Sequence, residues 1–140
     1  MTPQHYRIVD HTADFGLEIF GRSASDLFEQ AARALTDLLT DPAVLKEQRR
    51  RILDIEGSDW EDLLINWLRE LLYLYNGEAQ FVAGVAIISI EPTRLRAEVA
   101  TEAYRMGHHD IRNEIKAVTY HQLEVRTDDD GWRARVIFDV

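Results

Sequence analysis

Apolar residues alternate with small or charged residues near the beginning of the chain. Phe15, Leu17 and Ile19 follow the period of two that is typical of a strand with one buried face. The apolar residues within 6–9 and 51–56 predict two further short strands. Strands and helices are therefore expected to be interleaved in this half of the chain.

Two other segments repeat their apolar residues every three to four positions, as amphipathic helices do. The first is expected to begin at Ser23, with Asp26 placed as in a capping box. The second is expected to begin at Ser58, with Glu61 in the matching position, and to end at Asn76-Gly77. The apolar positions are Leu27, Ala31, Leu35 and Leu38 in the first helix, and Leu64, Trp67, Leu68, Leu71 and Tyr75 in the second.

The second half of the chain is expected to contain only strands, over 81–90, 94–99, 115–125 and 132–138. The alternation changes phase near Ile87-Ile88, which indicates a β-bulge, and residues 128–131 have the Asp-Gly composition of a hairpin turn. The order β-β-α-β-α-β-β-β-β predicts a single α+β domain over residues 1–140. We expect a two-layer sandwich in which a mainly antiparallel or mixed β-sheet carries both α-helices on one face.

Composition and charge narrow the classes of function. The chain has 140 residues, enough for one domain with a full core, and its lack of cysteine excludes disulfides and thiolate metal sites. The formal net charge of -9 argues against direct RNA binding, and Arg49-Arg50-Arg51 is expected to be a solvated strand edge. No apolar run has membrane-spanning length and no signal-peptide pattern is present, so we expect a cytoplasmic protein without a membrane partner.

Carboxylates are the main candidates for chemistry. Asp10 and Asp14 lie between the first two predicted strands, and Asp139 lies at the tip of the last one, beside Val140 and its terminal carboxylate if that is the natural end. Carboxylates brought this close repel one another unless a cation sits among them. Oxygen ligands favour Ca2+, Mg2+ or Mn2+ over zinc. Two alternatives stay open: Asp10 is only a turn or capping residue, or none of these residues binds metal.

Three more positions carry polar groups that could serve the same site. His11 could be a metal ligand, a proton shuttle or a hydrogen-bonded structural residue. His109 lies in His108-His109-Asp110, which has a weak similarity to the His-Asp pair of metal-dependent phosphohydrolases. Its place between strands favours a loop that reaches toward a metal site or a partner. Lys116 could hold a phosphate or a carboxylate, or be a solvated or ion-paired strand residue.

Two long stretches of the chain resemble the archease family. They are Asp10-His11-Thr12-Ala13-Asp14 with Gly16-Leu17-Glu18, and Ile115-Lys116-Ala117-Val118-Thr119-Tyr120-His121 with Gly131-Trp132 and residues 136–140. The resemblance implies a divalent metal, Ca2+ first and Mg2+ or Mn2+ as alternatives. Its ligands would be the side chains of Asp14 and Asp139 and the main-chain oxygen of Val140, which favours Asp14 over Asp10.

The same resemblance implies a function. Archeases are small cofactor proteins of the GTP-dependent tRNA-splicing RNA ligase, and they promote its guanylylation and multiple turnover without a reaction of their own. This chain departs from the family pattern at Gln122, where a glycine usually follows the Tyr-His pair. In the loop before Ile115, Glu102 and His109 match the pattern, whereas Thr101 and Arg105 do not.

Three hypotheses remain at this point. The first is a metal-binding activator of the RNA ligase that is not itself an enzyme. The second is a stand-alone metal-dependent phosphohydrolase that uses Asp14, Asp139 and His11. The third is a chaperone-like modulator of other tRNA-processing enzymes, such as a tRNA methyltransferase.

Overall fold

The computed structural model describes residues 5–11 and 14–140, and for residues 9–11 it describes the backbone only. Thr12 and Ala13, in the middle of the acidic motif, lie outside the described residues. The strands are β1 (Tyr6–His11), β2 (Asp14–Gly21), β3 (Arg49–Glu56), β4 (Gln80–Glu91), β5 (Arg94–Ala103), β6 (Ala117–Asp128) and β7 (Gly131–Asp139). The helices are α1 (Ala24–Leu39), α2 (Trp60–Glu78) and the short 3-10 helix η1 (Pro42–Val44).

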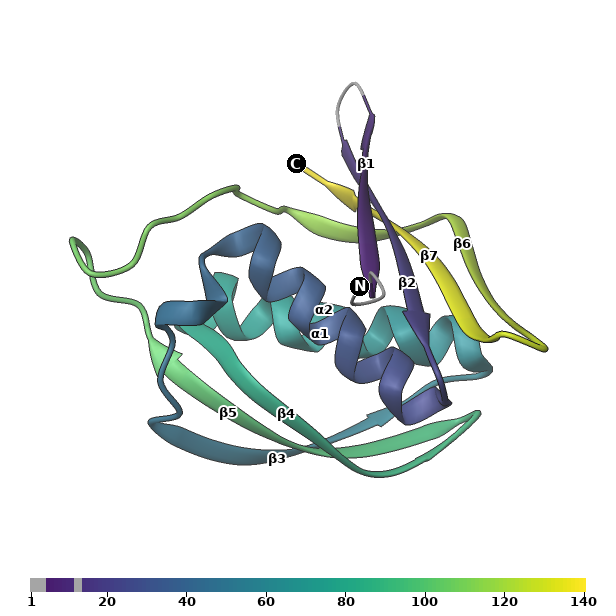
Figure 1. Cartoon of the computed structure of the whole chain (residues 1–140). Coiled ribbons are helices and arrows are strands. Elements are labelled where there is room, and N and C mark those ends of the chain that lie inside the picture. Colours follow the sequence, from purple (N-terminus) through teal and green to yellow (C-terminus); the bar gives the residue numbers. More distant parts are fainter. Residues whose placement is uncertain (1–4, 12–13) are drawn as a thin grey trace.

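The described strands pair into two sheets, and every pairing is antiparallel. One sheet has the order β1-β2-β7-β6 and the other has the order β3-β5-β4. Both helices contact strands of both sheets, and Figure 1 shows them between the two sheets. The expected α+β class and the antiparallel pairing are confirmed, and each sheet carries the helices on one face.

The sequence suggested one sheet, and the division into two has a packing reason. A helix that is apolar over a wide surface buries that surface only if other elements pack against it on more than one side. Helix α2 is such a helix, and strand β6 lies against it from one sheet while β3 and β4 lie against it from the other. Its buried residues are Leu63, Leu64, Ile65, Trp67, Leu68, Leu71, Leu72 and Leu74.

The core lies around the two helices, and its largest buried side chains are aromatic. Trp67 of α2 is fully buried, and its indole N–H donates to the Phe28 carbonyl of α1 at 3.0 Å. Phe28 is itself fully buried, as are Phe81 of β4 and Phe138 of β7, one from each sheet. In the part of the chain that the structure describes, no helix is long and apolar enough to cross a membrane.

The starts of the two helices follow the capping logic of the sequence. Ser23 caps α1 as predicted, because its hydroxyl accepts a hydrogen bond from the Asp26 N–H at 3.1 Å. In α2 the predicted box is wrong by one position. The cap is Asp59, whose carboxylate accepts from the Asp62 N–H at 2.8 Å. Aspartate is as good a cap as serine, so two adjacent candidates could not be separated by residue type.

Helix α2 continues past its expected stop at Asn76-Gly77 and ends at Glu78. Ala79 forms the left-handed C-cap with a φ of 54°, and its N–H donates to the Tyr75 carbonyl at 2.9 Å. Gly77 remains helical beneath Tyr73, where an added Cβ would lie only 2.3 Å from a carbon of the Tyr73 ring. The glycine therefore reflects close packing within the helix.

Strand β4 is bulged against β5. Its register shifts between Ile87 and Ser89, which confirms the bulge that the change of phase predicted. A second shift between Val82 and Gly84 was not indicated by the alternation. In residues 82–84 the sequence is Val-Ala-Gly, which shows no alternation of apolar and polar side chains that could reveal the shift.

Strand β6 loses its register with β7 between Thr119 and Glu124. Gln122 lies inside this interval with a φ of 53°, in the left-handed region. Glycine adopts this conformation most readily, because it has no Cβ to clash with the backbone. The irregularity explains why a glycine fits the position after the Tyr-His pair better than glutamine does.

Candidate metal site where β2 and β7 meet

Two aspartates face each other across neighbouring strands. Strands β2 and β7 are antiparallel, and their register places Asp14 opposite Asp139 (Figure 1 shows the end of β7 beside β2). Residues directly opposite in such a pair have Cβ atoms about 4.5–5.5 Å apart and project from the same face. Asp14 is half-buried and Asp139 is exposed. The pairing therefore brings together two carboxylates that lie 125 positions apart in the numbering, from 14 to 139.

The next pair along the same strands shows which face this is. Phe15 lies opposite Phe138, and Phe138 is fully buried in the core. Because side chains alternate along a strand, Asp14 and Asp139 project from the opposite, outer face of the sheet. Further along that outer face, Glu18 forms an ion pair with Arg135, with an N–O distance of 3.5 Å. The two aspartates are at the end of this face, where the Asp139 side chain is exposed and the Asp14 Oδ1 atom is buried.

Asp10 and His11 are placed only through their backbone. Asp10 lies opposite Phe15 and His11 lies opposite Asp14 in the pairing of β1 with β2. Both residues belong to β1, which extends beyond the 6–9 segment that the pattern indicated. Their proposed contacts with a metal or a partner stay predictions.

Lys116 lies beside the same strand end. Its N–H donates to the Asp139 carbonyl at 2.7 Å, just before β6 begins and pairs Ala117 with Asp139. The residue is exposed, and its ammonium group makes no ion pair with any residue that the structure describes. It lines a hollow of about 470 Å³ together with Tyr75, Asn76, Tyr104 and Glu114. Lys116 is therefore adjacent to the aspartate pair and available to an anionic group of a partner.

His109 has a different environment from the one expected. It is only 3% exposed, and its Nε2 lies 3.0 Å from a carboxylate oxygen of Glu102, which belongs to β5 of the other sheet. The backbone N–H of Arg105 donates to His109 Nδ1 at 3.0 Å. Since Nδ1 accepts a hydrogen bond, the proton of the neutral ring must be on Nε2, where it is donated to Glu102. The ring therefore closes the 105–109 turn onto β5.

Glu102, His108 and His109 also come close enough to suggest a second metal site. One possible ligand atom from each lies within 4.8 Å of the others. The hydrogen-bonding pattern does not fit a metal ion, however, because neither nitrogen of His109 offers an unused lone pair. A metal would have to replace the Nε2 proton while Nδ1 lost its contact with Arg105. We therefore interpret this group as a structural hydrogen-bond network.

The carboxylate of Glu102 is the centre of that network. It accepts from the Lys46 N–H at 3.2 Å and from the Gln48 amide at 3.3 Å, in addition to His109. Burial alone would raise the pKa of Glu102, but the hydrogen bonds from His109 and from Lys46 N–H outweigh it, so the pKa lies below its ordinary value. A charged carboxylate thus joins β5, the 46–48 segment and the 105–109 turn. In the sequence, Glu102 is distinguished only by its match to the family pattern and by its position between Thr101 and Ala103 in an apolar strand.

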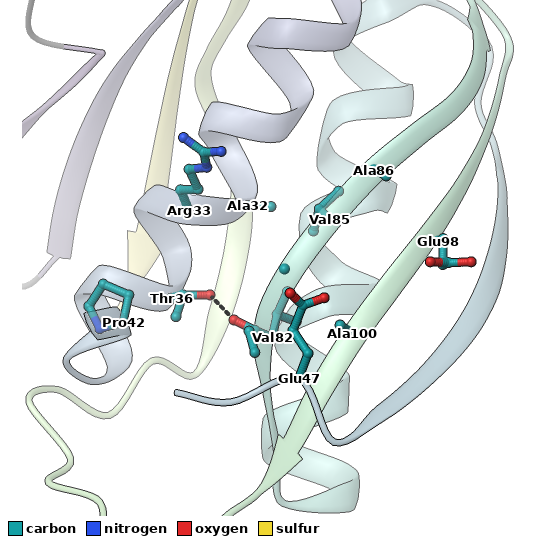
Figure 2. Close-up of a pocket in the computed structure, with 12 residues that line it drawn as sticks. Ala32, Arg33, Thr36, Pro42, Glu47, Val82, Val85, Ala86, Glu98 and Ala100 are labelled. Carbon is teal, nitrogen blue, oxygen red and sulfur yellow. Dashed lines mark hydrogen bonds between the residues drawn. The ribbon is translucent and has the colours of Figure 1, made fainter. Parts of the chain in front are cut away.

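A separate hollow of about 350 Å³ lies between α1 and β4 (Figure 2). Thr36 closes one side of it, since its hydroxyl donates to the Val82 carbonyl at 3.1 Å. The charges around it are mixed: Arg33 on α1, and Glu47 and Glu98 on the opposite side. Because its charged lining residues differ in sign, this hollow does not indicate a particular class of ligand or reaction.

The basic cluster agrees with its expected solvated role. It lies in β3, an edge strand of its sheet. Arg50 pairs with Glu98 at 3.5 Å and Arg51 pairs with Glu78 at 3.2 Å. These cations are balanced locally, which does not favour a phosphate-binding surface.

Two helices between two antiparallel sheets, with paired aspartates at matched strand ends, define a small α+β protein with a candidate site for a hard cation. The model of the Archease protein family (MTH1598/TM1083) matches residues 6–140. The chain therefore belongs to the archease family.

Relatives and solved structures agree with this assignment. Protein archease of Archaeoglobus fulgidus is 34% identical over 96% of this chain and 98% of its own length. The one of Methanosarcina barkeri is 32% identical over 98% and 97%. The solution structure of Methanobacterium thermoautotrophicum protein 1598 has a TM-score of 0.81 and 31% identity, and covers 97% of this chain and 99% of its own. The crystal structure of a Thermotoga maritima archease, described as a possible chaperone, shares the fold with a TM-score of 0.63 and 24% identity over 94% of each chain.

Proposed function

We propose that this protein is a cytoplasmic, non-catalytic activator of the GTP-dependent tRNA-splicing RNA ligase, and that its active element is a divalent cation held by Asp14 and Asp139. The observation that carries the proposal is the register that sets these two aspartates opposite each other. The ligase as partner is what the resemblance to the archease family implies, and the match to the family model supports that choice. The partner would be a protein, consistent with a net charge of -9 and with a locally neutralised basic cluster.

The donor set fits a hard cation. Two carboxylates on one face, with a main-chain oxygen beside them, match the all-oxygen preference of Ca2+, and also suit Mg2+ or Mn2+. The Asp139 carbonyl already accepts the Lys116 N–H, so Val140 is the better-placed main-chain ligand. Bound there, the cation would neutralise the two carboxylates, so that Lys116 would be the net positive charge beside the site. His11, opposite Asp14 in the register, would act as an additional contact to the metal or the partner, and Asp10, opposite Phe15, as a contact to the partner.

Ligase turnover tests the proposal. We expect the wild type to stimulate guanylylation and multiple turnover of the ligase, and Asp14→Ala and Asp139→Ala to lose most of that stimulation. Asp129→Ala is the matched control, because it removes one exposed carboxylate from the hairpin at the opposite end of β7. Full stimulation by both site variants would contradict the proposal. Phosphatase or phosphodiesterase activity without the ligase, lost in the same variants, would favour the stand-alone phosphohydrolase.

A second candidate rests on the description of the Thermotoga maritima protein as a possible chaperone. In that case this protein would modulate other tRNA-processing enzymes, such as a tRNA methyltransferase. The two candidates differ in their partner. Co-purification with a methyltransferase, combined with no stimulation of the ligase, would favour the second.

A further inference from the structure

Strand β6 is an edge strand, and side chains of helix α2 form hydrogen bonds with its backbone and with the segment just before it. It is last in the order β1-β2-β7-β6, so β7 pairs with only one of its sides. Backbone groups on the unpaired side of an edge strand need other partners. Helix α2 lies against β6, and its Glu61 carboxylate accepts the Val125 N–H at 3.3 Å. At the other end of the strand, the Asn76 side-chain amide donates to the Ile115 carbonyl at 3.0 Å.

The Asn76 contact is part of a short chain of hydrogen bonds to the aspartate pair. The Ile115 carbonyl and the Lys116 N–H belong to the same peptide group, which is planar and rigid. In a trans peptide these two groups point in opposite directions, so one peptide connects α2 on one side with β7 on the other. Its N–H donates to the Asp139 carbonyl at 2.7 Å. That carbonyl in turn is in the peptide group that joins Asp139 to Val140.

The surroundings leave this peptide little freedom. The Ile115 side chain is 3% exposed and belongs to the core, so the residue cannot move outward without losing apolar burial. The only side-chain donor that the described structure places on the Ile115 carbonyl is Asn76. Hydrogen bonds in a chain also polarise one another, so that loss of the first weakens the second.

We propose that Asn76 is a positioning residue for the cation site: it fixes the Ile115–Lys116 peptide, which fixes the Asp139–Val140 peptide and hence the orientation of the proposed ligands Asp139 and Val140. The inference rests on the proposed function for the identity of the site. Asn76 contacts neither aspartate, and its sequence signal, an Asn-Gly pair, indicated only the end of a helix. Its role follows from its partner 39 positions away.

Asn76→Ala is the test variant, with Glu61→Ala as its matched control. Both release one end of the same strand from the same helix, but only the Asn76 hydrogen bond is made to the peptide whose N–H donates to the Asp139 carbonyl. Alanine is a better helix former than asparagine, so α2 stays intact in the test variant. We expect Asn76→Ala to speed amide hydrogen exchange at Lys116 about fivefold and to weaken binding of Tb3+, a luminescent substitute for Ca2+, by a similar factor. Glu61→Ala should speed exchange at Val125 and leave both Lys116 exchange and Tb3+ binding within twofold of the wild type.

The inference and the proposed function fail in different ways. If Lys116 exchange in Asn76→Ala stays within twofold of the wild type, the inference is wrong. It is also wrong if exchange accelerates while Tb3+ binds both proteins equally well. If the wild type does not bind Tb3+, or Asp14→Ala binds it normally, the proposed metal site is wrong, and Lys116 exchange alone then decides whether Asn76 fixes the peptide.

Discussion

Asp14 lies directly opposite Asp139 in the antiparallel pairing of β2 with β7. Like charges in directly opposed positions destabilise a sheet, and a cation between them reverses the sign of that interaction. If the proposed cation binds between them, the stability of this sheet should depend on metal.

Asp139→Asn should raise the stability of the metal-free protein and remove its response to Ca2+. Loss of one of two opposed charges relieves about 0.2–1 kcal/mol of repulsion, while the amide is a poorer ligand for Ca2+ than the carboxylate. Thermal unfolding with and without Ca2+ measures both effects. The wild type should melt at a higher temperature in Ca2+ and the variant at the same temperature in both buffers, with Asp129→Asn behaving as wild type. Equal responses of wild type and Asp139→Asn would count against the site.

Gln122→Gly should stabilise the fold by about 0.5–1 kcal/mol. Gln122 has a φ of 53°, a conformation that costs a residue with a Cβ about 1–2 kcal/mol, and part of this gain is offset by the greater freedom of glycine in the unfolded chain. Denaturant unfolding measures the difference. Gln122→Ala keeps the Cβ and should give no such gain. A destabilised Gln122→Gly would show that the side chain, not the backbone, determines this position.

The His109 ring should carry its proton on Nε2 and accept a hydrogen bond at Nδ1. The Arg105 N–H that donates to Nδ1 determines this tautomer. The nitrogen chemical shifts of the ring measure it directly by NMR. Added Zn2+ should leave these shifts unchanged, because both nitrogens are engaged. Zn2+-dependent shifts at His109, absent in His108→Ala, would instead indicate a metal site formed with Glu102 and His108.

Acid should release the network around Glu102. The pKa of Glu102 is lowered in the folded protein, so the unfolded chain binds more protons in acid than the native state does. The stability from this group is therefore present above its ordinary pKa of 4.5 and is lost as the pH falls toward the lower folded value. Glu102→Gln should flatten this part of the dependence of unfolding free energy on pH. Glu98→Gln, at a half-buried carboxylate of the same strand, is the control, and an identical profile for Glu102→Gln and the wild type would contradict the argument.

Features that depend on neighbouring residues could be predicted from the sequence. The change of phase at Ile87-Ile88 locates a real bulge, and Ser23 is a real cap, because both depend only on adjacent residues. The convergence of Asp14 and Asp139 could be suggested, since strand tips collect polar groups. The register that aligns them depends on which strands become neighbours, and local patterns do not contain that information.

Asn76 and His109 act through partners that the local sequence does not indicate. Asn76 has the sequence of a helix end, but its amide binds a carbonyl that precedes β6. His109 has the sequence of an exposed loop, but its partner is a buried glutamate in β5. The two sheets likewise depend on the pairing of β3 with β5, across the whole of α2 and β4. In each case the tertiary fold determines the contact partner, and the residue type alone does not identify that partner.

The central claim is that Asp14, Asp139 and Val140 share one divalent cation. Crystals soaked in Mn2+ test it most directly, because anomalous scattering distinguishes the ion from water and from the lighter atoms of the protein. The account predicts one strong peak between the Asp14 and Asp139 carboxylates and within bonding distance of a Val140 main-chain oxygen, absent in Asp14→Ala crystals. Bound Mn2+ elsewhere, such as beside Glu102 and His108, with none between the two aspartates, would contradict it.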